Sequence, residues 1–323
     1  MNYTAYASLC PLRMRRWIEM GSDLTAQQSL PGLDSPLTGD VSNDRNTMLH
    51  SFFALEAKRM DPIEYKANGV EITVQGTKSG IATINDKEIL VYICSIAGQK
   101  LGRGEHLSQK FRFTAHDFFN VTGKTPGGKT YRYFAAALER LQGTQIKTNI
   151  VTGGRRERTW FSWLKSARME TAIWSNGHEA MKAIEVELCD WLWRAIIDDK
   201  ATLISSESYF YLPPLERKLY EVGYAECADC TTAAVPLEEL RQRMGVTTDL
   251  RHFRHNLGKT IAKGSLKGFA IEFVHRNEAG HLVPPRRRIP LDRLMVRFER
   301  RLNIPLIDPA LIRQRETEPL AVA

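Results

Sequence analysis

The stretch Pro236–Arg276 reads PLEELRQRMGVTTDLRHFRHNLGKTIAKGSLKGFAIEFVHR, and its pattern decides the fold. A short helix over Leu237–Met244 ends at Gly245, and a brief turn leads into a longer helix over Asp249–Lys263 that another glycine closes. A strand-like run, Phe269–Arg276, comes next. Short helix, turn, long helix and hairpin in this order predict a helix-turn-helix with a β-wing behind it.

The same order of elements occurs once more, nearer the N-terminus. A short helix over Asp117–Val121, a turn and a longer helix over Lys129–Gln142 precede two strand-like runs, Thr144–Val151 and Arg158–Ser166. In the later copy the second wing strand is expected over Arg286–Leu291. One copy alone would be weak support, whereas a pattern repeated inside one chain indicates a structural repeat. The sequence therefore predicts an α+β fold of tandem winged helix-turn-helix domains that form a pseudo-repeat.

These patterns divide the chain into segments. The expected segments are a flexible N-terminal arm (1–46), a first winged-helix domain (47–182), a second winged-helix domain (183–302) and a C-terminal tail (303–323). The arm is expected because residues 21–46 are rich in Gly, Ser, Pro, Asp and Asn and lack an apolar period. Asn68-Gly69 predicts a two-residue hairpin between strands over Ile63–Ala67 and Val70–Gln75. An apolar helix over Ile184–Ile197 is expected to join the two halves.

The longer helix of the later copy has one apolar and one basic face. Leu250, Phe253, Leu257 and Ile261 recur at helical spacing and are expected to face the core. A helix that enters the major groove uses basic and hydroxyl side chains on base edges and phosphates. The residues predicted to bind DNA on this helix and in the turn before it are Thr247, Thr248, Arg251, His252, Arg254, His255, Lys259 and Lys263.

The longer helix of the earlier copy repeats this arrangement, with Phe134, Ala137, Leu138 and Leu141 facing inward. Its predicted DNA-binding residues are Thr125, Gly127, Lys129, Thr130, Arg132 and Tyr133. Arginines of the two hairpins are expected to contact DNA as well: Arg155, Arg156 and Arg158 in the earlier copy, and Arg286, Arg287 and Arg288 in the later one. A single basic helix face is often only solvated. Two such faces, each followed by a basic hairpin, predict double-stranded DNA as the partner.

A different interpretation of the earlier turn is a nucleotide site. Residues 123–130 read GKTPGGKT, which matches the G-x-x-x-x-G-K-[ST] pattern of a P-loop in full. A P-loop, however, needs a buried parallel strand before its first glycine, whereas helix-capping residues precede Asp117. The alternating βα units of a doubly wound sheet are also absent from the pattern. We therefore expect no enzyme activity and no cofactor, and a P-loop ATPase stays an alternative.

A zinc site is a further alternative. Cys227-x-x-Cys230 and His252-x-x-His255 resemble ligand pairs, but the two pairs lie further apart than in a zinc finger, and the histidines are too closely spaced. Both histidines also fall on the helix that is predicted to read DNA. We expect neither a metal site nor catalytic residues.

Composition narrows the remaining classes. The 323 residues include 45 Lys and Arg against 37 Asp and Glu, a formal charge of +8, and 43% of them are hydrophobic, which is ordinary for a globular protein. No apolar run approaches the roughly 18 residues of a membrane helix, and the N-terminus lacks the pattern of a secretion signal. Five cysteines, a small and odd number, suit a reducing compartment. We expect a cytoplasmic protein that does not bind membranes.

The segment before the earlier copy resembles a known family. Residues 80–90 read GIATINDKEIL, and they follow Phe52–Leu55 and the Asn-Gly hairpin. With these features the chain resembles plasmid replication initiators of the Rep A type, such as those of broad-host-range IncW plasmids, over about Met48–Leu302. The resemblance implies a tandem winged-helix initiator that binds repeated sites (iterons) at the plasmid origin and does not hydrolyse ATP.

The same resemblance implies partners and a division of roles. The helix Asp249–Lys263 would read the iteron, and the helix Lys129–Gln142 with its wing would add contacts or mediate dimerisation. Members of the family recruit the host replication initiator and the replicative helicase, and they often repress their own promoter as homodimers while monomers bind the origin. A winged-helix transcriptional repressor without a role in replication stays the alternative, because the residues alone do not separate the two functions.

Overall fold

The structure is a computed structural model that describes residues 32–173, 179–199, 202–205, 207–285 and 289–301. By its contacts the chain divides into two units, Met1–Leu33 and Asp34–Ala323, and every element described below belongs to the second. No helix in the described ranges combines the length and the apolar character that crossing a membrane requires.

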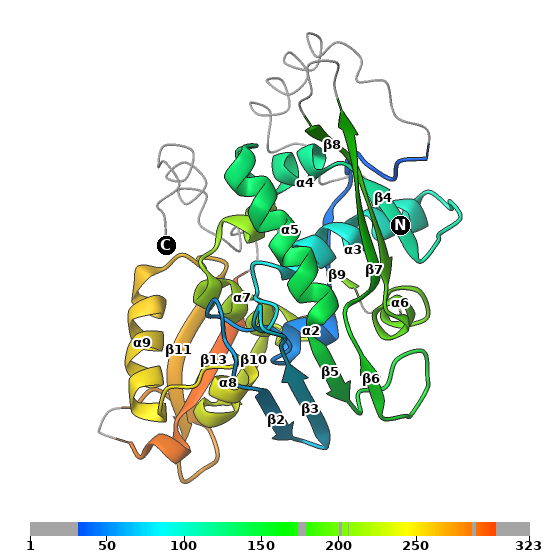
Figure 1. The fold of residues 1–323 in the computed structure, drawn as a ribbon. Coiled ribbons are helices and arrows are strands. Elements are labelled where there is room, and N and C mark those ends of the chain that lie inside the picture. Colours follow the sequence, from blue (N-terminus) through cyan, green and yellow to red (C-terminus); the bar gives the residue numbers. More distant parts are fainter. Residues whose placement is uncertain (1–31, 174–178, 200–201, 206, 286–288, 302–323) are drawn as a thin grey trace, which may run out of the picture. The chain divides into compact units, whose positions relative to one another are not determined.

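Two sets of elements in the second unit follow one order along the chain (Figure 1). Each set begins with a helix and a strand, continues with a short and a long helix, and ends with two long strands. The first set is α3 (Lys87–Gly102), β4 (Lys110–Phe113), α4 (Ala115–Thr122), α5 (Gly128–Gly143), β7 (Leu164–Ile173) and β8 (Glu179–Leu188). The second is α7 (Pro214–Glu226), β10 (Thr232–Pro236), α8 (Leu237–Arg243), α9 (Leu250–Lys263), β11 (Phe269–Arg276) and β13 (Met295–Arg300). We call these sets the first and the second repeat.

The sheets of the two repeats also have the same strand order. In the first repeat β8 lies between β4 and β7, and in the second β13 lies between β10 and β11. A short strand, β12 (Leu282–Val283), pairs with the outer edge of β11. All of these pairs are antiparallel. The chain is thus a mixed α/β protein in which both element order and strand pairing occur twice.

A glycine in the left-handed conformation ends the short helix of each repeat. Gly123, directly after α4, has a φ of +67°, and Gly245, shortly after α8, has a φ of +68°. Residues with a Cβ adopt this region only at a cost, so glycine suits the sharp change of direction between two helices. The long helix of the second repeat, α9, ends in the same way at Gly264.

A third sheet stands outside the two repeats. It contains β2 (Ile63–Ala67), β3 (Val70–Gln75), β5 (Gln145–Thr148) and β6 (Thr159–Phe161), in that spatial order and all antiparallel. The predicted hairpin is confirmed, because β2 and β3 have the expected bounds and Asn68 and Gly69 both have positive φ. The two strand runs predicted as the first wing pair as β5 and β6, but in this sheet. In the sheet of the first repeat, the strands that follow α5 are β7 and β8.

Two further predictions about individual elements are wrong. The segment Ile184–Ile197 is not one helix, because β8 continues to Leu188 and only the remainder forms α6 (Asp190–Ile197). The strand that pairs with β11 is not the predicted run Arg286–Leu291 but β13, which lies after it. Within that run, Arg286–Arg288 fall outside the described residues, and Leu291 begins the 3-10 helix η2 (Leu291–Arg293).

The end of the predicted flexible arm is ordered. Val41–Asp44 form a buried strand, β1, which pairs antiparallel with β9 (Thr202–Ser205) and packs on α3. A short helix, α2 (Arg45–Leu49), follows directly, with the Asp44 side chain as its N-cap. No local pattern in the sequence predicts this strand, because its partner lies far along the chain. Residues 1–31 of the predicted arm fall outside the described part of the chain.

Two buried apolar clusters stabilise the second unit. The first joins the helices and sheet of the first repeat to β2, β3, β5 and α6, and Trp163 and Trp191 are among its largest fully buried side chains. The second is formed mainly by the second repeat, where it includes Tyr220, Phe253, Leu257 and Phe298, and it extends to Val41 of β1 and Val91 of α3. Each long helix therefore has its own apolar support.

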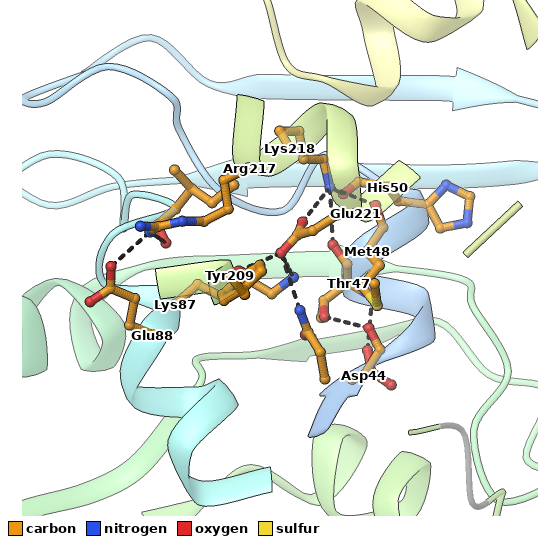
Figure 2. A network of polar contacts seen from close by, with 12 residues as sticks. Asp44, Thr47, Met48, His50, Lys87, Glu88, Tyr209, Arg217, Lys218 and Glu221 are labelled. Atoms are coloured by element: carbon orange, nitrogen blue, oxygen red, sulfur yellow. Dashed lines mark hydrogen bonds and ion pairs between the residues drawn. The ribbon is translucent and has the colours of Figure 1, made fainter. Parts of the chain in front are cut away.

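A buried polar network connects the second repeat to the segments before and within the first (Figure 2). Glu221 on α7 is fully buried, and its Oε1 accepts hydrogen bonds from Lys87 Nζ (2.6 Å), Tyr209 Oη (2.6 Å) and Asn43 Nδ2 (3.3 Å). Its Oε2 lies 3.3 Å from Lys218 Nζ. Burial alone would raise the pKa of Glu221, but the two ammonium groups outweigh it and hold this pKa below its usual value.

Residues 217 and 218 of α7 extend this network in two directions. Lys218 Nζ donates to the carbonyls of Thr47, Met48 and His50 at the end of α2, over 2.8 to 3.1 Å. Burial lowers the pKa of Lys218 to about 8, although Glu221 acts in the opposite direction. Arg217 pairs with Glu88 at the start of α3 over 2.8 Å. The second repeat is therefore joined to α2 and α3 through paired, buried charges.

Candidate nucleic-acid interface

Helix α9 has the apolar and basic faces that the sequence predicts. Phe253 and Leu257 are buried, and Leu250 and Ile261 pack against the same cluster from its edge. The residues on the other side of α9 and in the turn before it are exposed: Thr247, Thr248, Arg251, His252, Arg254, His255 and Lys259. The structure therefore brings these predicted site residues together on one solvent-facing surface.

The N-terminus of α9 is closed by a carboxylate. Asp249 accepts from the backbone N–H groups of Arg251 (2.9 Å) and His252 (3.0 Å), and its second oxygen pairs with the His252 ring. Hydrogen bonds from the His252 ring and backbone hold the pKa of Asp249 below its usual value. An ionised carboxylate at this end stabilises the helix, but it also occupies the N–H groups that a phosphate would use.

Two predicted site residues of α9 have partners inside the protein. The Arg254 guanidinium lies 5.4 Å from the centre of the Phe273 ring on β11, and Lys263 Nζ lies 3.0 Å from Glu216 on α7. In the part of the chain that the structure describes, Arg251 and Lys259 form no ion pair. Lys263 therefore differs from the other cations of α9, because its charge is already matched by a carboxylate.

The N-terminus of α5 is open instead of capped. Its N-cap, Gly127, provides no side-chain hydrogen bond, and a Cβ placed on Gly127 or Gly128 would meet no atom within 4 Å. The hydroxyl of Thr130 donates to the Thr125 carbonyl over 2.8 Å, which holds the turn in front of the helix. Unpaired N–H groups at a helix N-terminus attract anions. The first repeat thus offers backbone donors where the second repeat has a carboxylate.

Side chains on the first turns of α5 add positive charge to this end. Lys129, Arg132 and Tyr133 are exposed, and Lys129 Nζ lies 5.7 Å from the centre of the Tyr133 ring. The opposite side of α5 is buried through Phe134, Ala137, Leu138 and Leu141, as the sequence predicts. Tyr133 keeps 57% of its surface exposed and is one of the few large hydrophobic residues at the surface of the described part of the chain.

Residues 123–130, which match the P-loop pattern, lie between two helices, α4 and α5, and not after a strand. A helix, α4, comes directly before Gly123, where a P-loop has a strand, and all described strand ladders are antiparallel. We expect purified wild-type protein to show no magnesium-dependent ATP turnover and Lys129→Ala to weaken DNA binding. A coupled ATPase assay and a DNA titration check this, and ATP hydrolysis that Lys129→Ala abolishes would contradict it.

The predicted arginines of the first hairpin do not join α5. Arg155, Arg156 and Arg158 lie on the β5–β6 connection, and Arg158 pairs with Glu71 of β3 over 3.1 Å. In Figure 1 this connection lies beyond the C-terminal end of α5, whereas the DNA-binding residues predicted on α5 are at its N-terminus. These arginines therefore lie away from Lys129, because the hairpin after α5 belongs to another sheet, and their contact with DNA stays a prediction.

The β7–β8 hairpin supplies the corresponding position. In Figure 1 the end of this hairpin at which β7 finishes and β8 begins lies at the same end of the repeat as the N-terminus of α5, and Arg168 on β7 is exposed. The sequence interpretation did not include this residue, because it ended the second wing strand at Ser166, near the start of β7, and assigned the end of β8 to a helix. For the second repeat, Arg286, Arg287 and Arg288 fall outside the described residues.

Three of the four candidate zinc ligands have other contacts, among them Cys230, whose thiol lies 3.3 Å from the carbonyls of Glu226 and Thr232. Cys227 is buried and its thiol lies 3.7 Å from the Phe298 carbonyl, whereas His252 pairs with the cap of α9. Among the described residues, no three His, Cys, Asp or Glu side chains are grouped so that they could hold a metal ion.

Comparison with family models assigns most of the chain to one family. Residues 42–271 match the family model of replication initiator protein A. The chain is 29% identical over 239 residues to a putative replication protein of Wigglesworthia glossinidia brevipalpis, which covers 72% of this chain and 86% of that protein. It also resembles the fold of domains 2 and 3 of RctB, with a TM-score of 0.50 and 14% identity over 76% of this chain and 92% of that one. Since the matched residues make up most of the chain, this protein belongs to the replication initiator protein A family.

Proposed function

We propose that this initiator acts on a plasmid, where it binds repeated sites in double-stranded origin DNA through both repeats. Each repeat then acts as a winged helix-turn-helix domain, with α5 or α9 in a major groove and β7–β8 or β11–β13 as the wing. The exposed cationic surface of α9, supported by its buried apolar side, is the observation that carries this proposal. In this function the protein recognises DNA and catalyses no reaction.

The two helix N-termini support different roles in that complex. The Asp249 carboxylate fills the N-terminus of α9 and repels phosphate, so this helix contacts base edges with side chains such as Arg251. The open N-terminus of α5, next to Lys129, suits a backbone phosphate. The second repeat therefore contributes most of the base readout, and the first repeat mainly positions the protein on the duplex.

The arrangement of the long helices suits a two-groove site. In Figure 1, α5 and α9 run in opposite directions, as expected for two units that face successive grooves of one duplex. Each repeated DNA site, or iteron, then spans about two helical turns. We further propose that the protein represses its own gene from such sites, forms a homodimer that dissociates on iterons, recruits the host initiator and replicative helicase, and acts in the cytoplasm.

Loss of base readout is the expected result of Arg251→Ala. The test uses a duplex that the wild-type protein selects from a random-sequence library, and a shuffled version of it. A bidentate arginine–guanine contact contributes about 1–3 kcal/mol of discrimination, so the affinity ratio between the two duplexes should fall roughly 5- to 150-fold. Competition binding at one fixed salt concentration measures this ratio.

The matched control is Lys129→Ala in the first repeat, which should weaken both duplexes about equally because it contacts phosphate. If the wild-type protein selects no sequence at all, the proposed function is wrong. If Lys129→Ala lowers the affinity ratio between the two duplexes and Arg251→Ala leaves it unchanged, the assignment of base readout to α9 is wrong.

A further inference from the structure

The turn that precedes α9 is held by a side chain from outside its own repeat. Arg59 lies in the loop 50–62, which connects α2 to β2, and its Nη1 donates to the Gly245 carbonyl over 2.7 Å. Its Nε and Nη2 donate to the carbonyls of Asp61 and Pro62, both over 3.2 Å. A guanidinium is rigid and planar, so these contacts fix the turn against the loop in one orientation.

Direct packing strengthens the same contact. Gly245 has positive φ, and a Cβ at this position would come within 2.3 Å of Ser51 Oγ in the loop. Ser51 is fully buried. Beside it, Asn68 of the β2–β3 turn donates to Glu239 on α8 over 2.8 Å. The loop and the neighbouring hairpin therefore contact both α8 and the turn that leads into α9.

The second repeat holds the rest of this turn by itself. Arg241 Nη1 donates to the carbonyls of Val246 (3.2 Å) and Thr248 (3.1 Å). Carbonyls on both sides of the bend therefore accept from arginines, one of which belongs to the loop 50–62. Because α9 begins at Leu250, only a few residues later, the direction of its first turn follows from how this bend is fixed.

The first repeat shows the reciprocal arrangement. A Cβ on Gly123 would come within 2.6 Å of Tyr211 Oη, which lies just before the second repeat. The neighbouring Lys124 pairs with Glu88, and Glu88 also pairs with Arg217 of α7 over 2.8 Å. In both repeats, then, the glycine turn between the two helices rests on residues from outside that repeat.

We propose that Arg59 is a positioning residue for DNA recognition. It does not touch DNA; it fixes the turn from which α9 projects, so that sequence readout by the second repeat depends on a side chain packed outside it. This inference rests on the proposed function, since it presumes that α9 reads bases.

The test measures specificity in the full-length protein with the selected duplex and its shuffled version. Arg59→Ala should lower the affinity ratio about tenfold, while the slope of log K against log salt stays the same, because no phosphate contact is lost. The matched control is Arg45→Ala. Arg45 also reaches the second repeat, at the Ala225 carbonyl (3.4 Å) and Asp229 (2.6 Å), but not its turn. We expect the affinity ratio of the Arg45→Ala variant to stay within about twofold of the wild-type ratio.

A double-variant cycle separates positioning from an independent contribution. If Arg59 acts through α9, Arg59→Ala should hardly change the affinity ratio between the two duplexes in a protein that already carries Arg251→Ala. In a protein that carries Arg132→Ala, the effects of the two substitutions should add. Arg59→Lys keeps the positive charge but has only one donor group, so this variant should fold even if Arg59→Ala does not. We expect its affinity ratio between the two duplexes to be lower than that of the wild type.

Three results would overturn the inference: an unchanged ratio in both Arg59 variants, a salt slope lower by about one, which marks a direct phosphate contact, or full additivity with Arg251→Ala. Failure of the proposed function looks different, because the wild-type protein would then select no duplex over its shuffled version.

Discussion

Glu221→Ala should lower the free energy of unfolding by about 3–5 kcal/mol, the usual cost of removing one partner from a buried ion pair. The Glu221 carboxylate is fully buried between the ammonium groups of Lys87 and Lys218 and accepts from Tyr209. Without it, two cations and a phenol remain buried with no anion between them. Such a loss is a large part of the roughly 5–15 kcal/mol by which domains are stable. Urea unfolding followed by circular dichroism measures it.

The matched control for this experiment is Asp229→Ala. Asp229 also pairs with a cation from the N-terminal segment, Arg45, over 2.6 Å, but its side chain is 77% exposed. Exposed pairs contribute about 0–1 kcal/mol, so the control should unfold at nearly the wild-type urea concentration. If Glu221→Ala costs no more than Asp229→Ala, the network does not stabilise the connection between the repeats as described.

Binding to the selected duplex should weaken roughly 150-fold between about 50 and 200 mM salt, because cations bound to phosphate release counterions from DNA. Besides Arg251, which is assigned to a base edge, four exposed cations on α5 and α9 have no carboxylate partner among the described residues: Lys129, Arg132, Arg254 and Lys259. At about 0.9 per neutralised phosphate, these four predict a slope of about −3.6 in a plot of log K against log salt. Fluorescence anisotropy at several salt concentrations gives this slope.

Two lysines of the same helix provide the comparison. Lys259→Ala should make the slope shallower by about 0.9, whereas Lys263→Ala should leave it unchanged, because Lys263 is already paired with Glu216. A wild-type slope shallower than about −2, or equal effects of the two substitutions, would show that the basic surface of α9 is not the DNA contact.

Local chemistry made part of this fold predictable. The β2–β3 hairpin has the expected bounds because Asn68-Gly69 takes the positive φ values of its turn by itself. Helix α9 matches its expected range within one residue, since Asp249 caps one end and Gly264 closes the other. In both cases the residues that set the boundary are neighbours in the sequence.

Elements that depend on distant partners were missed. Strand β1 has no pattern of its own and exists because β9 pairs with it. The alternation in Ile184-Glu185-Val186-Glu187-Leu188 is typical of a strand, but the helical period of Trp191–Ile196 directly after it concealed this signal. For the site, the exposure of Arg251 and Lys259 followed from the helical period, whereas nothing near Lys263 indicates its pairing with Glu216.

The pairing of β1 with β9 sets an order of events during synthesis. Val41 lies opposite Ser205 and Asp44 opposite Thr202, and the whole first repeat lies between them in the sequence. At about 5–20 residues per second, a ribosome delivers β9 roughly 10–30 s after β1. During that interval β1 has hydrogen-bonding groups but no strand partner, while the first repeat can already fold. Translation that stops before residue 202 therefore releases a chain with an unpaired strand, which is a template for association with other chains.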